Sequence, residues 1–141
     1  NIKGKLKTHE IKKNWNLIEG IKQIKKMEVF QNKNFTKEFE NEVNKSDIIV
    51  DALFGTGLNG KLNNQIEFVM NQINKSKKSI VAVDIPSGLN PLDGSVANYV
   101  IKAELTVTFH KSKSGLLQRN EITGKIIIVD IGIPPELENN L

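Results

Sequence analysis

Two spacings of apolar residues alternate along the chain. Apolar positions three and four residues apart predict helices that follow Thr8 and Thr36, each placed as an N-cap, and a third helix from Asn63 to Ser76. Short, continuous apolar runs bounded by polar residues predict strands. These runs are residues 27–30, 47–54, 79–85, 104–109 and 125–131.

The order of these elements indicates the fold class. Strands that alternate with helices imply crossover connections and a parallel sheet covered by helices. We therefore expect an α/β fold, a three-layer Rossmann-like sandwich with a mostly parallel central sheet. The run at 47–54 is typical of a strand that is buried on both faces. The predicted inward faces are Ile11, Trp15, Ile18 and Ile21 in the first helix, Phe39 and Val43 in the second, and Ile66, Val69, Met70 and Ile73 in the third.

A glycine-rich loop follows the strand at 47–54. Gly55, Gly57 and Gly60 form the dinucleotide pattern G-x-G-x-x-G, and Gly55, Gly60 and Lys61 form G-x-x-x-x-G-K, which is most of a P-loop. A P-loop needs a hydroxyl after the lysine to hold Mg²⁺, and Leu62 has none. The dinucleotide pattern fits better, although glycines that only allow a tight turn remain an alternative.

Two aspartates stand where neighbouring strands end. Asp51 and Asp84 each close a predicted strand, and open parallel sheets bind ligands beyond the carboxyl ends of their strands. Asp51 and Ser87 offer oxygen ligands for an alkali or alkaline-earth cation. Asp84 is a candidate acid or base, and it also lies where a ribose-binding acid is expected. For each aspartate alone, a cap in its loop is the simpler explanation.

The bulk composition narrows the classes of function. The 141 residues include no cysteine, which excludes disulfides and thiolate chemistry and is compatible with the cytoplasm, where we expect the protein. The net charge of +4 comes from a lysine-rich sequence with few aromatic residues, so we expect no nucleic-acid partner. No apolar run approaches the length of a membrane span, so we expect no membrane partner.

Four motifs together resemble one known family. "DIIVDALFGTGL", "VAVDIPSGLNPLDG", "ELTVTFHKSKSGLL" and "VDIGIP" are similar, in order and spacing, to the YjeF N-terminal domain, the NAD(P)HX epimerase family. "GKLKTHEIKKNWNLI" also resembles the segment that follows the second strand of the family. The likeness covers nearly the whole chain.

The resemblance implies roles for individual residues. Asp51 and Ser87 match the potassium ligands of the family, and Asp84 matches a residue that contacts the substrate and is our candidate catalytic acid or base. Lys113 matches a further family position, for which a solvated loop lysine is the alternative. The substrate-binding loop that the resemblance implies consists of Gly55, Thr56, Gly57, Leu58, Asn59, Gly60 and Lys61.

The resemblance also implies an activity. Family members interconvert the R and S epimers of hydrated NADH and NADPH (NADHX and NADPHX), tend to form homodimers, and act beside a dehydratase that is fused or separate. We expect an epimerase domain at residues 1–135 and the start of a linker at 136–141.

One family motif is absent from this sequence. The Asn-Asn-Gly-Gly-Asp loop that follows the first strand of the family does not occur, so we expect that an N-terminal part of the domain is missing. A non-catalytic module of the same fold that binds a nucleotide or a partner is therefore the alternative. A redox dehydrogenase comes third, because its phosphate loop should follow the first strand.

Overall fold

The chain divides into two compact units, which we describe separately. The computed structural model describes residues 9–27, 35–55, 62 and 64–138. The first unit is Asn1–Glu42 and the second is Val43–Leu141. The proposed domain boundary at residue 135 stays a prediction.

The first helix is shorter than its apolar pattern. α1 (His9–Glu19) ends just before Gly20, and the ammonium group of Lys26 donates to the carbonyl of Glu19 at 2.8 Å. Ile21 therefore lies in the turn beyond the helix rather than on its face. Ile18 and Ile21 are 39% and 41% exposed, so the predicted inward face is not buried at these positions. Thr8, and all of the expected strand at 27–30 except its first residue, lie outside the described residues.

The second helix starts earlier than predicted. α2 (Phe35–Lys45) begins one residue before Thr36, which therefore lies in its first turn and is not the N-cap. Phe35 and Phe39 stack with their ring centroids 5.4 Å apart, as residues four apart on one helix face can. Val43 continues this apolar stripe and is buried.

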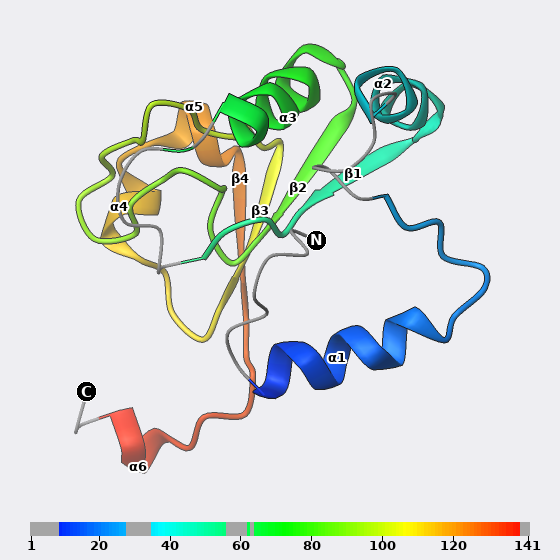
Figure 1. The fold of residues 1–141 in the computed structure, drawn as a ribbon. Coiled ribbons are helices and arrows are strands. Elements are labelled where there is room, and N and C mark those ends of the chain that lie inside the picture. Colours follow the sequence, from blue (N-terminus) through cyan, green and yellow to red (C-terminus); the bar gives the residue numbers. More distant parts are fainter. Residues whose placement is uncertain (1–8, 28–34, 56–61, 63, 139–141) are drawn as a thin grey trace. The chain divides into compact units, whose positions relative to one another are not determined.

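The second unit is built on one parallel sheet (Figure 1). Its strands lie in the order β1-β2-β3-β4, and every neighbouring pair is parallel. This arrangement confirms the predicted α/β, Rossmann-like fold. The short helices α4, α5 and α6 were not expected from the sequence. The elements are β1 (Ile48–Asp51), α3 (Asn64–Lys75), β2 (Ser79–Val83), β3 (Leu105–Phe109), α4 (Ser114–Leu117), α5 (Asn120–Thr123), β4 (Lys125–Val129) and α6 (Pro135–Glu138).

One face of the sheet forms the core. Because side chains alternate along a strand, Ile80, Ala82 and Thr106 share a face, and all three are buried. The Thr106 hydroxyl donates to the carbonyl of Thr123 in α5 at 2.7 Å, which satisfies a polar group in this core. The apolar cluster beside it consists of Ile85, Leu89, Leu116 and Ile122, with Val100 and Ile126 packed against it.

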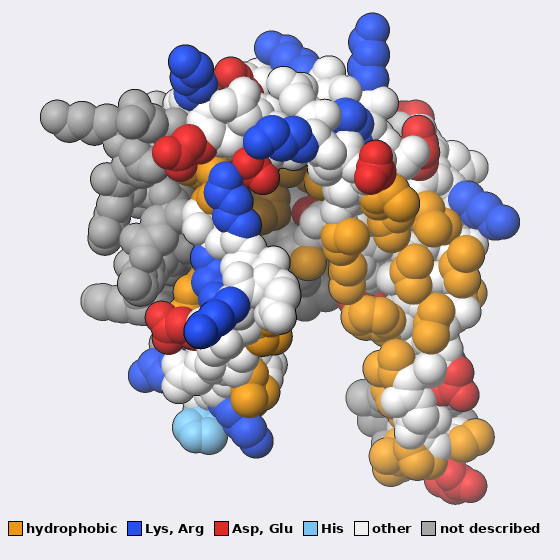
Figure 2. Space-filling model, turned by 90° about the vertical axis from the view of Figure 1, so that its right-hand side faces the viewer, with side chains coloured by type: hydrophobic (Ala, Val, Ile, Leu, Met, Phe, Trp, Pro, Cys, Tyr) orange, Lys and Arg blue, Asp and Glu red, His pale blue; other side chains and the backbone are white. Residues whose placement is uncertain are grey.

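The opposite face of the sheet is exposed at its two edges. Ile48 and Val50 of β1 are 59% and 62% exposed, and Ile127 and Val129 of β4 are 40% and 38% exposed. The prediction that the first strand of this sheet is buried on both faces is therefore wrong. Figure 2 shows hydrophobic side chains gathered together on one side of the view.

No helix in the described part of the chain is long and apolar enough to cross a membrane.

Candidate active site at the carboxyl edge of the sheet

The two aspartates singled out in the sequence, and a histidine, lie where the parallel strands end. Asp51 is the last residue of β1, Asp84 directly follows β2, and His110 directly follows β3. The register pairs Asp51 with Ala82, and the Asp84 amide donates to the Val107 carbonyl at 2.8 Å, so all three residues lie at the same edge of the sheet. Ligands of open parallel sheets bind at this edge.

Asp51 and Ser87 form one buried cluster, as the sequence predicted. Asp51 Oδ2 accepts from the Ser87 amide at 2.7 Å, and Asp51 Oδ1 accepts from the Ser87 hydroxyl at 2.6 Å. Both residues are only 1% exposed. Burial raises the pKa of the Asp51 carboxyl, and the hydrogen bonds from Ser87 and Leu53 offset only part of this effect.

The donor atoms of this cluster suit a hard cation. The Ser87 hydroxyl lies 3.4 Å from the carbonyl oxygen of Phe54, so a carboxylate, a hydroxyl and a carbonyl oxygen are close together. Such oxygen sets bind alkali and alkaline-earth ions. Within the described residues, no group of three or more His, Cys, Asp or Glu could hold a metal ion.

The glycine loop is anchored at both of its described ends. The Phe54 amide donates to Ser87 Oγ at 3.0 Å, and the Leu62 amide donates to Asn98 Oδ1 at 3.1 Å. Asn98 in turn donates to the carboxylate of Glu67 on α3. Gly55 is exposed, and no described residue lies within 4 Å of the position of an added Cβ. The other residues of the proposed substrate loop, 56–61, lie outside the described residues.

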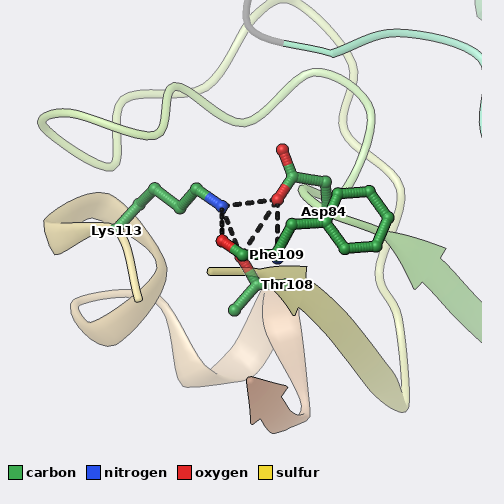
Figure 3. A network of polar contacts seen from close by, with 4 residues as sticks. All are labelled: Asp84, Thr108, Phe109 and Lys113. Atoms are coloured by element: carbon green, nitrogen blue, oxygen red, sulfur yellow. Dashed lines mark hydrogen bonds and ion pairs between the residues drawn. The ribbon is translucent and has the colours of Figure 1, made fainter. Parts of the chain in front are cut away.

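Asp84 lies in a second cluster, with Lys113 (Figure 3). Asp84 Oδ1 accepts from Lys113 Nζ at 2.5 Å, from the Phe109 amide at 3.0 Å and from Thr108 Oγ1 at 3.2 Å. Burial alone would raise the pKa of Asp84, but these hydrogen bonds and the charge of Lys113 together lower the pKa below its ordinary value. Asp84 is therefore a carboxylate at neutral pH.

The backbone of Asp84 is strained. Its φ is +66°, and the Ile85 amide donates across it to the Val83 carbonyl at 2.8 Å, which closes a three-residue turn. His110 repeats this arrangement at the end of β3, with a φ of +62° and a hydrogen bond from the Lys111 amide to the Phe109 carbonyl at 2.7 Å. Such γ-turns with positive φ are rare in non-glycine residues, and strain of this kind is often found at functional sites.

The structure separates residues that sequence reasoning had grouped. Asp51 and Asp84 share an edge of the sheet, but no hydrogen bond joins them, and each has its own partners. The ion pair between Asp84 and Lys113 was not predicted. The sequence did offer one indication, because Lys113 matches a position of the family. A solvated loop lysine explained that match equally well, so no role was assigned to Lys113.

Comparison with known proteins gives the family of the chain. A family model described as the YjeF-related protein N-terminus matches residues 3–115. The chain belongs to this family. The NAD(P)H-hydrate epimerase of Nitrosopumilus maritimus is 38% identical over 136 residues, which are 96% of this chain and 60% of that protein. The bifunctional NAD(P)H-hydrate repair enzyme Nnr of Archaeoglobus fulgidus is 43% identical over 117 residues, which are 82% of this chain and 25% of that protein.

The chain is shorter than these relatives. It spans about three fifths of the length of the first and a quarter of the second. The segment that the family model matches, residues 3–115, includes both polar clusters.

Proposed function

We propose that the domain epimerises hydrated nicotinamide nucleotides, NADHX and NADPHX. The observation that carries this proposal is the Asp84 carboxylate, which Lys113 orients at the ligand-binding edge of the sheet, three residues before the Ser87 hydroxyl that anchors the start of the glycine loop. The relatives are named for the same activity or for a repair activity on the same nucleotides, which supports the proposal.

The chemistry requires a group that can take and return a proton. In the hydrated nucleotide, C6 carries a hydroxyl and is bonded to the ring nitrogen N1. If Asp84 takes the hydroxyl proton, the C6–N1 bond can break, with its electron pair moving to N1 and C6 becoming an aldehyde carbon. The nitrogen anion is stabilised by conjugation with the ring carboxamide. Attack of N1 on the other face of the aldehyde re-forms the bond with inverted configuration, and the alkoxide takes the proton back from Asp84.

We also propose that Asp51 and Ser87 hold K⁺. The buried carboxylate and the neighbouring hydroxyl and carbonyl oxygens support this assignment. A cation there would supply positive charge next to a carboxylate whose burial otherwise disfavours ionisation. Ser87 also accepts from the Phe54 amide, so the same residue would link the ion to the start of the glycine loop.

Three further assignments rest on the sequence or on relatives alone. We propose a homodimer and a cytoplasmic location, both of which stay predictions. The bifunctional relative suggests that a second repair activity works with this domain, on the same polypeptide or on another.

The variant Asp84→Asn tests the catalytic assignment in the full-length protein. Asparagine is preferable to alanine here because it tolerates the positive φ of this position. We expect the rate of epimerisation of a purified R epimer, corrected for the spontaneous reaction, to fall by about 100-fold or more. The control is Asp93→Asn, which changes an exposed aspartate whose Oδ1 accepts from Ser95 in its own loop.

The outcome separates the proposed activity from its main alternative. Turnover close to wild type in Asp84→Asn, with an unchanged circular dichroism spectrum, would remove Asp84 from the mechanism. If the wild-type protein binds the nucleotide without epimerising it, the domain is a binding module of the same fold.

A further inference from the structure

We propose that Lys113 is a positioning residue for Asp84: its ammonium group holds one carboxylate oxygen and leaves the other directed to the substrate. The assignment of the second oxygen to the substrate rests on the proposed function. The effect of Lys113 on Asp84 does not, because it follows from the contacts between the two side chains.

The ammonium group of Lys113 has no donor left for a ligand. It donates to Asp84 Oδ1 at 2.5 Å, to Thr108 Oγ1 at 2.8 Å and to the Phe109 carbonyl at 3.0 Å. An ammonium group has three donors, and these three acceptors use all of them. A lysine that binds a phosphate or a substrate oxygen would need a free donor, so this geometry favours an internal role.

The two oxygens of Asp84 have different surroundings. Oδ1 accepts from Lys113, Thr108 and the Phe109 amide, whereas no hydrogen bond to Oδ2 is found within the described residues. Figure 3 shows Oδ2 pointing away from the three donors. One oxygen therefore fixes the orientation of the carboxylate, and the other keeps its lone pairs for a proton.

The Asp84 carboxylate is fixed by residues outside its own strained turn. Asp84 has a φ of +66°, and a strained backbone conformation of this kind persists only where the surrounding structure imposes it. The partners of Oδ1 come from the end of β3 and from the loop that precedes α4, so they fix the carboxylate from outside its own turn. Both side chains are about one quarter exposed, which limits the weakening of their attraction by solvent.

Carboxyl NMR measures the effect of Lys113 on Asp84 directly. The chain contains five aspartates, so ¹³C-carboxyl labelling of aspartate gives a small set of signals, and the Asp84 signal is the one lost in Asp84→Asn. Lys113 supplies the one charge that lowers the pKa of Asp84 within the described residues, and the titratable neighbours in the same loop are His110 and Lys111. We expect Lys113→Met to raise the pKa of Asp84 by about one unit or more.

The matched control is Lys111→Met. It removes the same charge from the same loop, at an exposed side chain two residues away, and should leave the pKa of Asp84 close to wild type. An unchanged pKa of Asp84 in Lys113→Met would overturn the proposal. If that variant does not fold, Lys113→Gln, which keeps a donor but loses the charge, replaces it with the same expected direction.

Kinetics of the full-length protein distinguish positioning from direct binding. We expect Lys113→Met to lower kcat by about 10- to 100-fold with KM changed by less than about threefold, and Lys113→Arg to restore part of kcat because it keeps the charge. A higher KM with normal kcat would overturn the proposal by making Lys113 a substrate ligand. A loss that Lys113→Arg does not restore, with a lower melting temperature, would overturn it by making the role structural.

The two measurements fail independently. If the wild-type protein does not epimerise the hydrated nucleotide, the proposed function fails, while the titration of Asp84 still decides whether Lys113 controls that carboxylate.

Discussion

Gly88 shows how a single residue shapes the cation cluster. Its φ is +94°, and a Cβ at this position would lie 2.2 Å from the carbonyl oxygen of Tyr99. The Ala97 amide donates to the Gly88 carbonyl at 2.8 Å, and the Ile101 amide donates to the Ser87 carbonyl at 2.9 Å. The segment after Ser87 therefore folds back against Gly88 and fixes the backbone that carries the Ser87 hydroxyl.

Alanine substitutions at Gly88 and Gly55 should differ sharply in their effect on stability. Gly88→Ala should lower the free energy of unfolding by about 3 kcal/mol or more, because the new methyl group meets backbone and the φ is unsuitable for alanine. Gly55→Ala should change it by less than about 1 kcal/mol, because no described residue lies within 4 Å of its Cβ position. Urea unfolding measures both variants. Equal losses at the two positions would contradict this account.

The end of α3 is stabilised less well than it could be. The helix finishes at Lys75, the Ser76 amide donates to the Ile73 carbonyl at 3.1 Å, and Lys77 follows with a φ of +57°. Glycine is the usual residue in the left-handed position after a helix, because a side chain there costs about 1 kcal/mol. Lys77 is exposed, so its side chain is not needed for packing.

The same substitution two residues apart should therefore have opposite effects. Lys77→Gly should raise the free energy of unfolding by up to about 1 kcal/mol, whereas Lys75→Gly, inside the last turn of α3, should lower it by a similar amount. Thermal unfolding of the two variants beside wild type checks the signs. A loss of stability in Lys77→Gly would mean that its side chain makes a contribution that outweighs the strain.

The elements differ in how far the sequence could predict them. The predicted inward residues of α3 are all buried, because a one-sided apolar stripe on a helix has few alternatives to the core. The four strands of the sheet could be predicted because each is a short apolar run. The exposure of Ile48 and Val50 could not be predicted, because a continuous apolar run does not say what covers each face of the strand. The helix predicted to follow an N-cap at Thr36 starts two residues earlier, at Phe35, which is within the usual uncertainty of helix ends.

The two polar clusters also differ in how far the sequence could predict them. Asp51 and Ser87 could be paired because both follow adjacent strands and both belong to a recognisable motif. The pairing of Asp84 with Lys113 depends on two γ-turns with positive φ and on the path of the loop between β3 and α4. That path is difficult to predict from the sequence, because neither Asp84 nor His110 is a glycine, the residue that most often marks a positive φ.

At the scale of the whole molecule, a cation would couple the site to overall stability. Asp51 is buried, and its two oxygens are shared only with Ser87 and Leu53 among the described residues. An ion that binds this cluster in the folded state, and not in the unfolded chain, shifts the folding equilibrium towards the folded state. The size of the shift depends on ion concentration, so stability reports binding without any need for turnover.

Thermal unfolding of the full-length protein in K⁺ tests this coupling. Above the dissociation constant, each tenfold increase in K⁺ should add about 1.4 kcal/mol to the free energy of unfolding, with N-methylglucamine chloride keeping the ionic strength constant. Asp51→Asn should remove this dependence, because the variant keeps the shape of the side chain but not its charge. Asp93→Asn, at an exposed aspartate, should retain it. An equal response to K⁺ in wild type and Asp51→Asn would place the ion elsewhere, and no response in wild type would show that Asp51 and Ser87 form a purely structural hydrogen-bonded pair.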